Sequence, residues 1–293
     1  MKKLGLATAL LLAMTGAQAY QFEVQGQSEH LEIDGAHNKF TGAAQGTYYF
    51  NNVDSKKGPL AEAAFLNQAS NVAVAYNFGK FSQVGGNTQY TSQSFGVKGE
   101  AYLATPVVPV YASAAYNHTN RDNKNGVRDN NGDIYSVEVG TVVIPNFLIA
   151  AGYTRVADQA RSTYDTFDIL QNGAVKAAFD RATIGNKKDV ATARAKYVGG
   201  IDGTNMAVGF EAGLVRGENT AYTFKSDLYL TPALSIGGSY SNSSAKSYDQ
   251  MWTADVNYFI TPALSVAAQY SSTNALGRNP DIQSVGLNAQ YRF

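Results

Sequence analysis

Ser284-Val285-Gly286-Leu287-Asn288-Ala289-Gln290-Tyr291-Arg292-Phe293 ends the chain with strict alternation of apolar and polar residues. One face carries Val285, Leu287, Ala289, Tyr291 and Phe293, and the other face is polar. The segment that begins at Tyr20 has the same pattern, with Tyr20, Phe22 and Val24 facing away from Gln21, Glu23 and Gln25. A period of two predicts a strand with one apolar and one polar side.

The same alternation recurs between these two ends, which gives fourteen predicted strands in all. The twelve internal ones are Phe40 to Phe50, Val72 to Phe78, Phe95 to Leu103, Val110 to His118, Tyr135 to Val143, Phe147 to Tyr153, Ala191 to Tyr197, Met206 to Leu214, Tyr222 to Leu230, Leu234 to Tyr240, Trp252 to Ile260, and Leu264 to Tyr270.

The connections between these strands alternate between two kinds. Short ones are marked by proline, as at Pro145-Asn146, Thr231-Pro232-Ala233 and Thr261-Pro262-Ala263, whereas Asn120 to Gly132 and Asp158 to Asp189 are longer and polar. This alternation is typical of outer-membrane barrels. We therefore expect an all-β fold, a closed antiparallel transmembrane β-barrel of fourteen strands with short periplasmic turns and longer extracellular loops.

Aromatic residues provide an independent test against the alternative of a soluble β-sandwich. Two aromatic belts flanking an aliphatic band are what the two interfaces of a membrane select. The residues predicted near the outer strand ends are Phe78, Phe95, Tyr116, Tyr135, Tyr153, Tyr222, Tyr240, Trp252 and Tyr270. Those predicted near the inner ends are Phe22, Phe50, Phe147, Tyr197, Tyr258 and Phe293.

The N-terminus resembles a secretory signal peptide. Lys2 and Lys3 precede an apolar run to about Ala17, and Ala17-Gln18-Ala19 is a small-x-small cleavage site. The run is shorter than the ~20 residues of a membrane helix. We therefore expect residues 1–19 to be cleaved after export to the periplasm and residues 20–293 to form the barrel in the Gram-negative outer membrane.

If the apolar face meets lipid, the polar face lines the lumen. It carries five basic and six acidic residues, and this mixture predicts only weak selectivity by charge sign unless the two signs cluster in rings. The alternative is that these groups pair with one another and brace the wall. The predicted pore-lining residues are Glu23, Lys98, Glu100, Glu138, Arg194, Lys196, Glu211, Lys225, Asp227, Asp255 and Arg292.

Two connections are candidates for narrowing that lumen. Lys56 to Asn67 sits at a predicted periplasmic turn but is long, and its segment Pro59 to Leu66 is compatible with a short helix. Asp158 to Asp189 contains apolar patches, and a structureless connection of that length is uncommon and often functional. We expect at least one of them to fold inward, and the alternative is packing against the rim.

No catalytic residue, metal site or cofactor is expected. The three histidines, His30, His37 and His118, have no metal-ligand spacing. The sequence has no P-loop and no Gly-x-Ser-x-Gly elbow. There is no cysteine, so disulfides and thiolate metal sites are excluded, and 23 basic against 23 acidic residues give no electrostatic reason to expect nucleic acid.

Several runs resemble the Acinetobacter outer-membrane porin family that is named for an apparent mass of thirty-three to thirty-six kilodaltons. They are Tyr20 to Glu29, Gly58 to Asn67, Lys196 to Asn205 and Tyr258 to Leu264. The similarity spans the chain and is weakest in the outer loops, notably Asp158 to Asp189. It implies a fourteen-stranded outer-membrane barrel that acts as a channel for water or small solutes.

These observations together predict a porin-like channel for passive diffusion of water and small hydrophilic solutes. The alternative is a closed structural or adhesive barrel that acts through its extracellular loops, and an outer-membrane hydrolase is a more distant one. The expected partners are outer-membrane lipid, the solutes and the barrel assembly machinery, for which the terminal Tyr291 and Phe293 resemble the assembly signal. The oligomeric state is not encoded in any motif.

Overall fold

A computed structural model describes residues 19–33, 39–82, 89–123, 130–157, 165–186, 188–246, 248–275 and 281–293. The expected signal peptide lies outside these residues except for Ala19, which begins the first strand. Its cleavage therefore stays a prediction. His37 and parts of the long outer connections also lie outside the described residues.

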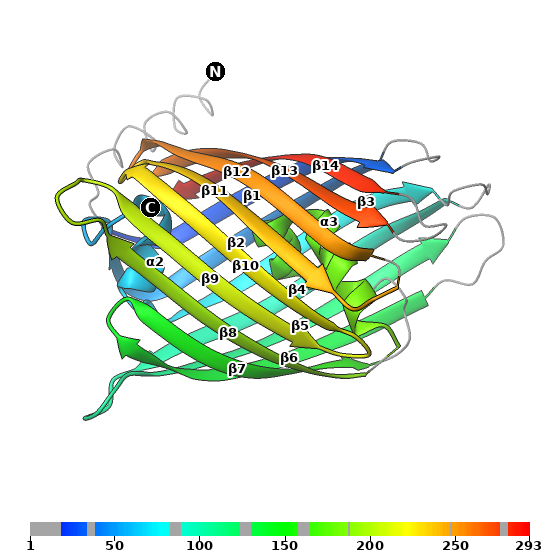
Figure 1. Cartoon of the computed structure of the whole chain (residues 1–293), viewed down its shortest axis with the longest axis horizontal. Helices are drawn as coiled ribbons and strands as arrows, with labels where there is room; N and C mark the ends of the chain where they lie inside the picture. Colours follow the sequence, from blue (N-terminus) through cyan, green and yellow to red (C-terminus); the bar gives the residue numbers. More distant parts are fainter. Residues whose placement is uncertain are drawn as a thin grey trace, which may run out of the picture.

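The chain forms one closed antiparallel barrel of fourteen strands, each paired with its neighbours in sequence, and β1 pairs with β14 to complete the ring (Figure 1). The predicted fold class and strand number are confirmed. The strands are β1 Ala19–Ile33, β2 Lys39–Asp54, β3 Asn71–Ser82, β4 Gln89–Leu103, β5 Val110–Asn123, β6 Asn130–Ile144, β7 Phe147–Ala157, β8 Asp189–Gly200, β9 Ala207–Arg216, β10 Thr220–Thr231, β11 Leu234–Ser243, β12 Tyr248–Thr261, β13 Leu264–Ala275 and β14 Ile282–Arg292.

Many strands are longer than the sequence predicted, above all toward the outer side. A strand crosses the hydrocarbon in about 9–11 residues, yet β2 has 16 residues and β1, β4 and β6 have 15 each. Strand β5, for example, continues to Asn123, five residues past His118 where the alternation was expected to end. The extensions were missed because beyond the lipid both faces of a strand are solvated, so period two disappears while backbone pairing continues.

The apolar faces point outward. Val139 and Leu287 are each 63% exposed on the outer surface of the barrel. In an outer-membrane barrel this surface is an apolar band that faces lipid. Aromatic residues predicted for the outer belt meet across strands, with Tyr116 opposite Tyr135 and Tyr240 opposite Trp252. At the inner end Phe22 stacks on Phe293 with ring centroids 5.4 Å apart. Both belts therefore follow the register of the sheet.

Two segments lie on the inner side of the wall. The β2–β3 connection contains the short helix η1 Leu60–Glu62 followed by α2 Ala63–Leu66, so the predicted helical turn there exists. The β7–β8 connection contains α3 Thr166–Ile184. Helix α3 contacts β1 to β4 and β12 to β14 on one side and β9 and β10 on the other, which places it inside the barrel (Figure 1).

The outward face predicts a strong asymmetry between two adjacent residues of β14. Leu287→Arg places a charge in lipid near mid-strand and should lower the free energy of unfolding in bilayers by about 2–4 kcal/mol. The matched variant Asn288→Arg points to the lumen and should cost much less. Denaturant titration of both variants folded into lipid vesicles measures the difference, and equal losses would contradict the assignment of faces.

Candidate pore lining

The barrel encloses a cavity of about 770 Å³ between the wall and the two internal segments. Ten of the eleven residues predicted to line a pore border it, from β1, β4, β6, β8, β9, β10 and β12. They are Glu23, Lys98, Glu100, Glu138, Arg194, Lys196, Glu211, Lys225, Asp227 and Asp255.

Arg292 is placed differently. Its side chain faces inward from β14, but it is 4% exposed and does not border the cavity. Its Nε donates to Glu23 at 3.0 Å, its Nη1 donates to the Leu60 carbonyl at 2.8 Å, and its guanidinium lies over the rings of Tyr20 and Phe259. The η1 segment covers it, so Arg292 holds that segment against the wall instead of lining the lumen.

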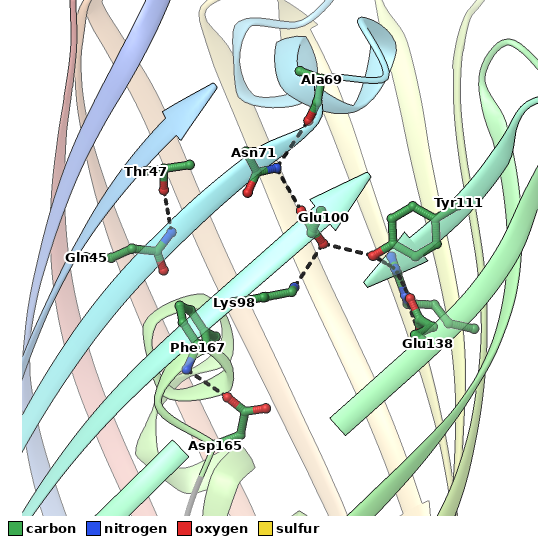
Figure 2. A network of polar contacts seen from close by, with 11 residues as sticks. Gln45, Thr47, Ala69, Asn71, Lys98, Glu100, Tyr111, Glu138, Asp165 and Phe167 are labelled. Carbon is green, nitrogen blue, oxygen red and sulfur yellow. Dashed lines mark hydrogen bonds and ion pairs between the residues drawn. The ribbon is translucent and has the colours of Figure 1, made fainter. Parts of the chain in front are cut away.

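A polar network on β3 to β5 surrounds Glu100 (Figure 2). Lys98 Nζ lies 3.0 Å from Glu100, the Tyr111 hydroxyl donates to it at 2.8 Å, and Asn71 donates to it at 3.1 Å. Tyr111 is 1% exposed and in turn accepts a hydrogen bond from Arg194 at 3.3 Å. The charges of Lys98, Glu100 and Arg194, which the closed wall removes from bulk water, thus all have partners, as a low-dielectric site requires.

Further ion pairs extend the network along the β6 to β10 side of the wall. Arg194 pairs with Glu138 at 2.6 Å and Lys225 with Asp227 at 3.5 Å. Removing one partner of a buried pair leaves an uncompensated charge, so such pairs fix side-chain positions even where their net stabilisation is small. The lining is thus a set of positioned charges, and bracing of the wall by pairing is part of the arrangement.

The inner-end segment, η1 with α2, is fastened by both polar and apolar contacts. Glu62 pairs with Lys196 at 2.9 Å and accepts a hydrogen bond from Tyr229 at 2.7 Å, while Leu60 N–H bonds to the Pro232 carbonyl at 2.8 Å. Burial alone would raise the pKa of Glu62, but the Lys196 ammonium outweighs it and the net pKa is lowered. Phe65 is buried beneath Lys196. This segment is firmly docked.

Helix α3 is interrupted at Gly173, where φ is +86° and the backbone leaves the helical region. Glycine suits that position because residues with a side chain rarely adopt it, and a Cβ there would lie 3.1 Å from Glu29 Oε1. Apolar side chains on both halves pack against the wall: Phe167 and Leu170 against β3, and Val175 and Phe179 against a cluster that includes Met251. Burying each contributes about 1.5–3 kcal/mol.

Inward polar side chains of the wall hold the break. Glu29 is 2% exposed and accepts from the Ala174 N–H at 2.7 Å, which caps the second half-helix. Gln269 donates to the Asn172 carbonyl at 2.8 Å and Gln25 to the Leu170 carbonyl at 3.2 Å. At the start of α3, Asn117 accepts from the Thr166 N–H at 3.1 Å. Glu29, Gln269 and Gln25 thus satisfy backbone atoms that the break leaves without helical partners, and Asn117 does the same at the first turn.

Glu29 and Gln269 were missed as candidate residues by the sequence reasoning. Glu29 continues the register of Glu23 beyond the predicted part of the first strand, so extending the polar face along β1 finds it. Gln269 lies on the polar face of the predicted strand Leu264 to Tyr270, but it is uncharged, and the predicted pore-lining residues are all charged. Their role toward α3 has no sequence signal, because it depends on a segment more than 90 residues away.

The cavity-facing side of α3 is charged. Lys176 and Asp180 form an i,i+4 ion pair, and Asp165 caps the helix by accepting from the Phe167 N–H at 2.9 Å. Burial, together with the carboxylates of Asp168 and Asp165, raises the pKa of Asp180 to about 6 despite the Lys176 ammonium. Burial and Asp168 also raise the pKa of Asp165. Docked α3 therefore binds protons more tightly than an undocked, solvated α3 would.

The described residues contain no group of three or more metal-ligating side chains. His118 Nδ1 lies 2.7 Å from Asp133 on the outward face of the barrel, and His30 is also exposed on an outward face, so neither reaches the cavity. No helix in the described ranges is long and apolar enough to cross a membrane.

A closed barrel with an aromatic-belted apolar exterior and a polar cavity inside is the architecture of an outer-membrane channel protein. The chain belongs to the family described as "Putative general bacterial porin", whose model matches residues 1–293. It is thus a porin-type channel of the Gram-negative outer membrane, as predicted. Family and fold indicate a channel rather than an enzyme.

Solved structures agree with this assignment. The chain is similar to the crystal structure of the Acinetobacter baumannii outer membrane protein Omp33, with 47% identity over 94% of this chain and 99% of that chain, and a TM-score of 0.69. The predicted resemblance to the Acinetobacter family is confirmed. A Pseudomonas aeruginosa FadL homologue shares the fold alone, with 9% identity over 96% of this chain and 92% of that chain, and a TM-score of 0.50. No curated protein sequence matches the chain.

The raised pKa of Asp180 predicts pH-dependent docking of α3. A carboxyl group whose pKa is about 6 when docked and near its ordinary 3.8 when solvated favours docking most below pH about 4. That advantage is lost as the pH rises to about 6. The chain has no cysteine, so Val175→Cys, at a position 0% exposed, reports undocking by its thiol-labelling rate relative to an exposed Asp202→Cys.

The relative labelling rate should rise between pH 4 and pH 7 and then level off. In the Val175→Cys protein, the additional substitution Asp180→Asn should remove most of this increase in labelling rate. The increase that remains is due to ionisation of Asp165. A rate ratio independent of pH would contradict the assignment.

Proposed function

We propose that this channel carries water and small hydrophilic solutes by passive diffusion, and that η1–α2 and α3 narrow it from the two ends. The observation that carries the proposal is the 770 Å³ polar cavity, which both segments border from inside the wall. The mechanism is selection by the width of the remaining passage and by its polar lining. It needs no cofactor and no chemical step.

The number of strands supports a size limit. An eight-stranded barrel is filled by its own side chains, whereas 16–18 strands leave an open aqueous channel. Fourteen strands give an intermediate lumen, and here part of it is occupied by two helical segments. The passage that remains suits water, inorganic ions and solutes of a few heavy atoms.

The two segments differ in how they are fastened, which points to α3 as the part that moves. Segment η1–α2 is tied by the Glu62–Lys196 ion pair and the Arg292–Leu60 hydrogen bond within a short connection. Helix α3 is broken at Gly173, is held at the break mainly by single hydrogen bonds, and carries carboxyl groups that oppose docking once ionised. We infer that undocking of α3 widens the channel.

The runner-up remains a closed structural or adhesive barrel that acts through its outer loops. In that case the ion pairs of the lining would only stabilise the barrel wall, and the purified protein would not conduct ions across a bilayer. The role of Tyr291 and Phe293 as a signal for the barrel assembly machinery also stays a proposal. Phe293 already closes the β1–β14 seam through two hydrogen bonds with Phe22, at 2.8 and 2.9 Å.

Deletion of Phe167 to Ala178 tests the narrowing by α3. The variant loses the break and most of the helix that crosses the lumen, so its single-channel conductance in planar bilayers should exceed that of the full chain. Normal assembly is checked by heat-dependent mobility in gel electrophoresis. Unchanged conductance of a normally assembled variant would refute narrowing by α3, and absence of conductance in both proteins would favour the closed barrel.

A point substitution tests the anchor at the break. Glu29→Ala removes the cap of the second half-helix, and loss of a helix cap costs about 0.5–2 kcal/mol. The dwell time in the wider state should lengthen accordingly. The matched control is Glu32→Ala, three residues further along β1, where the side chain is exposed and contacts no part of α3. If both variants gate as the unaltered protein does, Glu29 does not hold the helix in place.

A further inference from the structure

Carboxylates outnumber basic groups around the cavity. Ten acidic and six basic side chains border it, and Arg292 behind the wall neutralises Glu23, so seven basic groups face ten acidic ones. Three of the acidic residues, Asp168 and Asp180 of α3 and its N-cap Asp165, come from a segment whose position the strand pattern does not predict. The balance is more negative than the eleven residues selected from the sequence suggested.

Two wall carboxylates have no basic group within ion-pair distance in the described part of the chain, although cations lie further away. Glu211 and Asp255 border the cavity, yet neither forms a hydrogen bond or an ion pair within 4.0 Å there. Glu211 lies opposite Lys196 and Lys225 in the strand register. Lys196 is instead drawn to Glu62 of the inserted η1 segment, and Lys225 to Asp227. Because Lys196 pairs with the inserted segment, Glu211 forms no close ion pair and interacts with Lys176, Arg194 and Lys196 only at longer range.

Asp255 is unpaired for a related reason. A Cβ at Gly237 would lie 2.2 Å from Asp227 Oδ1 and 2.9 Å from both Asp255 carboxylate oxygens, so the two carboxylates lean over the same glycine. Lys225, 3.5 Å from Asp227, is the one basic group paired there among the described residues. The single ammonium group of Lys225 therefore lies beside two carboxylates, Asp227 and Asp255, and forms an ion pair with Asp227.

The α3 face opposite adds acceptors. Asp168 and Asp165 form no ion pair in the ranges that the structure covers, and the buried Oδ1 of Asp180 has no hydrogen-bond partner there. When a carboxylate is ionised, its oxygens accept hydrogen bonds and donate none. Carboxylates of α3, of its N-cap and of the β9–β12 wall therefore all border the cavity, and on α3 they stand beside Lys176 and Arg181.

We propose that the channel prefers cations over anions, and that Glu211 and Asp255 are the residues that set this preference. The inference rests on the proposed diffusion function and specifies which solutes it favours. Charges in a narrow, low-dielectric passage raise the local concentration of the opposite ion, and charged side chains in such positions determine which sign of ion is conducted. Close ion pairs contribute little to that field, so the largest share comes from wall carboxylates that have no basic group within 4.0 Å.

The test is the reversal potential of purified protein in planar bilayers under a KCl gradient. The unaltered chain should reverse on the side of cation preference. Glu211→Gln with Asp255→Asn should lose most of that shift, and Glu211→Lys with Asp255→Lys should move the reversal potential to the anion side. The control Asp202→Asn removes one negative charge from the exposed β8–β9 turn outside the cavity and should leave the potential unchanged.

The outcomes separate the two proposals. Conductance with a reversal potential at zero or on the anion side would overturn cation preference and leave the channel function standing. A cation preference that survives the double neutralisation, in protein of normal heat-dependent mobility, would overturn the assignment to Glu211 and Asp255. No conductance from either the full chain or the Phe167 to Ala178 deletion would overturn the channel function itself, and the inference with it.

Discussion

The structure depends on one constraint: a backbone that crosses lipid must satisfy all its hydrogen-bonding groups within the protein. Strands meet this requirement only if the sheet has no free edge, and pairing of β1 with β14 removes the last two edges. Closure fixes the alternation of side chains between lipid and lumen. It also explains why Phe293, at the very end of the chain, bonds to Phe22 at the start of β1.

Closure has a second consequence, because it creates an interior that is polar yet only partly exposed to solvent. Charged side chains there need partners, and the wall supplies them in the Lys98–Glu100 and Arg194–Glu138 pairs. The two inserted segments then compete for the same groups. Segment η1 binds Lys196 and Arg292, which leaves Glu211 without a close ion pair and removes Arg292 from the lumen. The electrostatics of the passage result from this competition.

Sequence patterns predict this structure where the signal is local and do not where it depends on distant residues. Alternation over ten residues placed Val285 and Leu287 outside and Glu138 and Lys196 inside, and the barrel class and strand number followed. Strand ends were placed too early, because solvated extensions such as the end of β5 lose the alternation. No sequence pattern predicts that α3 inserts into the barrel, breaks at Gly173 and is held by Glu29. These features depend on contacts across the barrel.

The sequence by itself determined which face of each strand meets lipid, because that property depends only on side chains two residues apart in an extended chain. It also determined that the sheet must close, since open edges are not tolerated in a bilayer. The tertiary structure alone decided which inward residues reach the cavity, which of them are paired, and where α3 lies. Those outcomes depend on distances between residues far apart in sequence, and no periodic pattern encodes such distances.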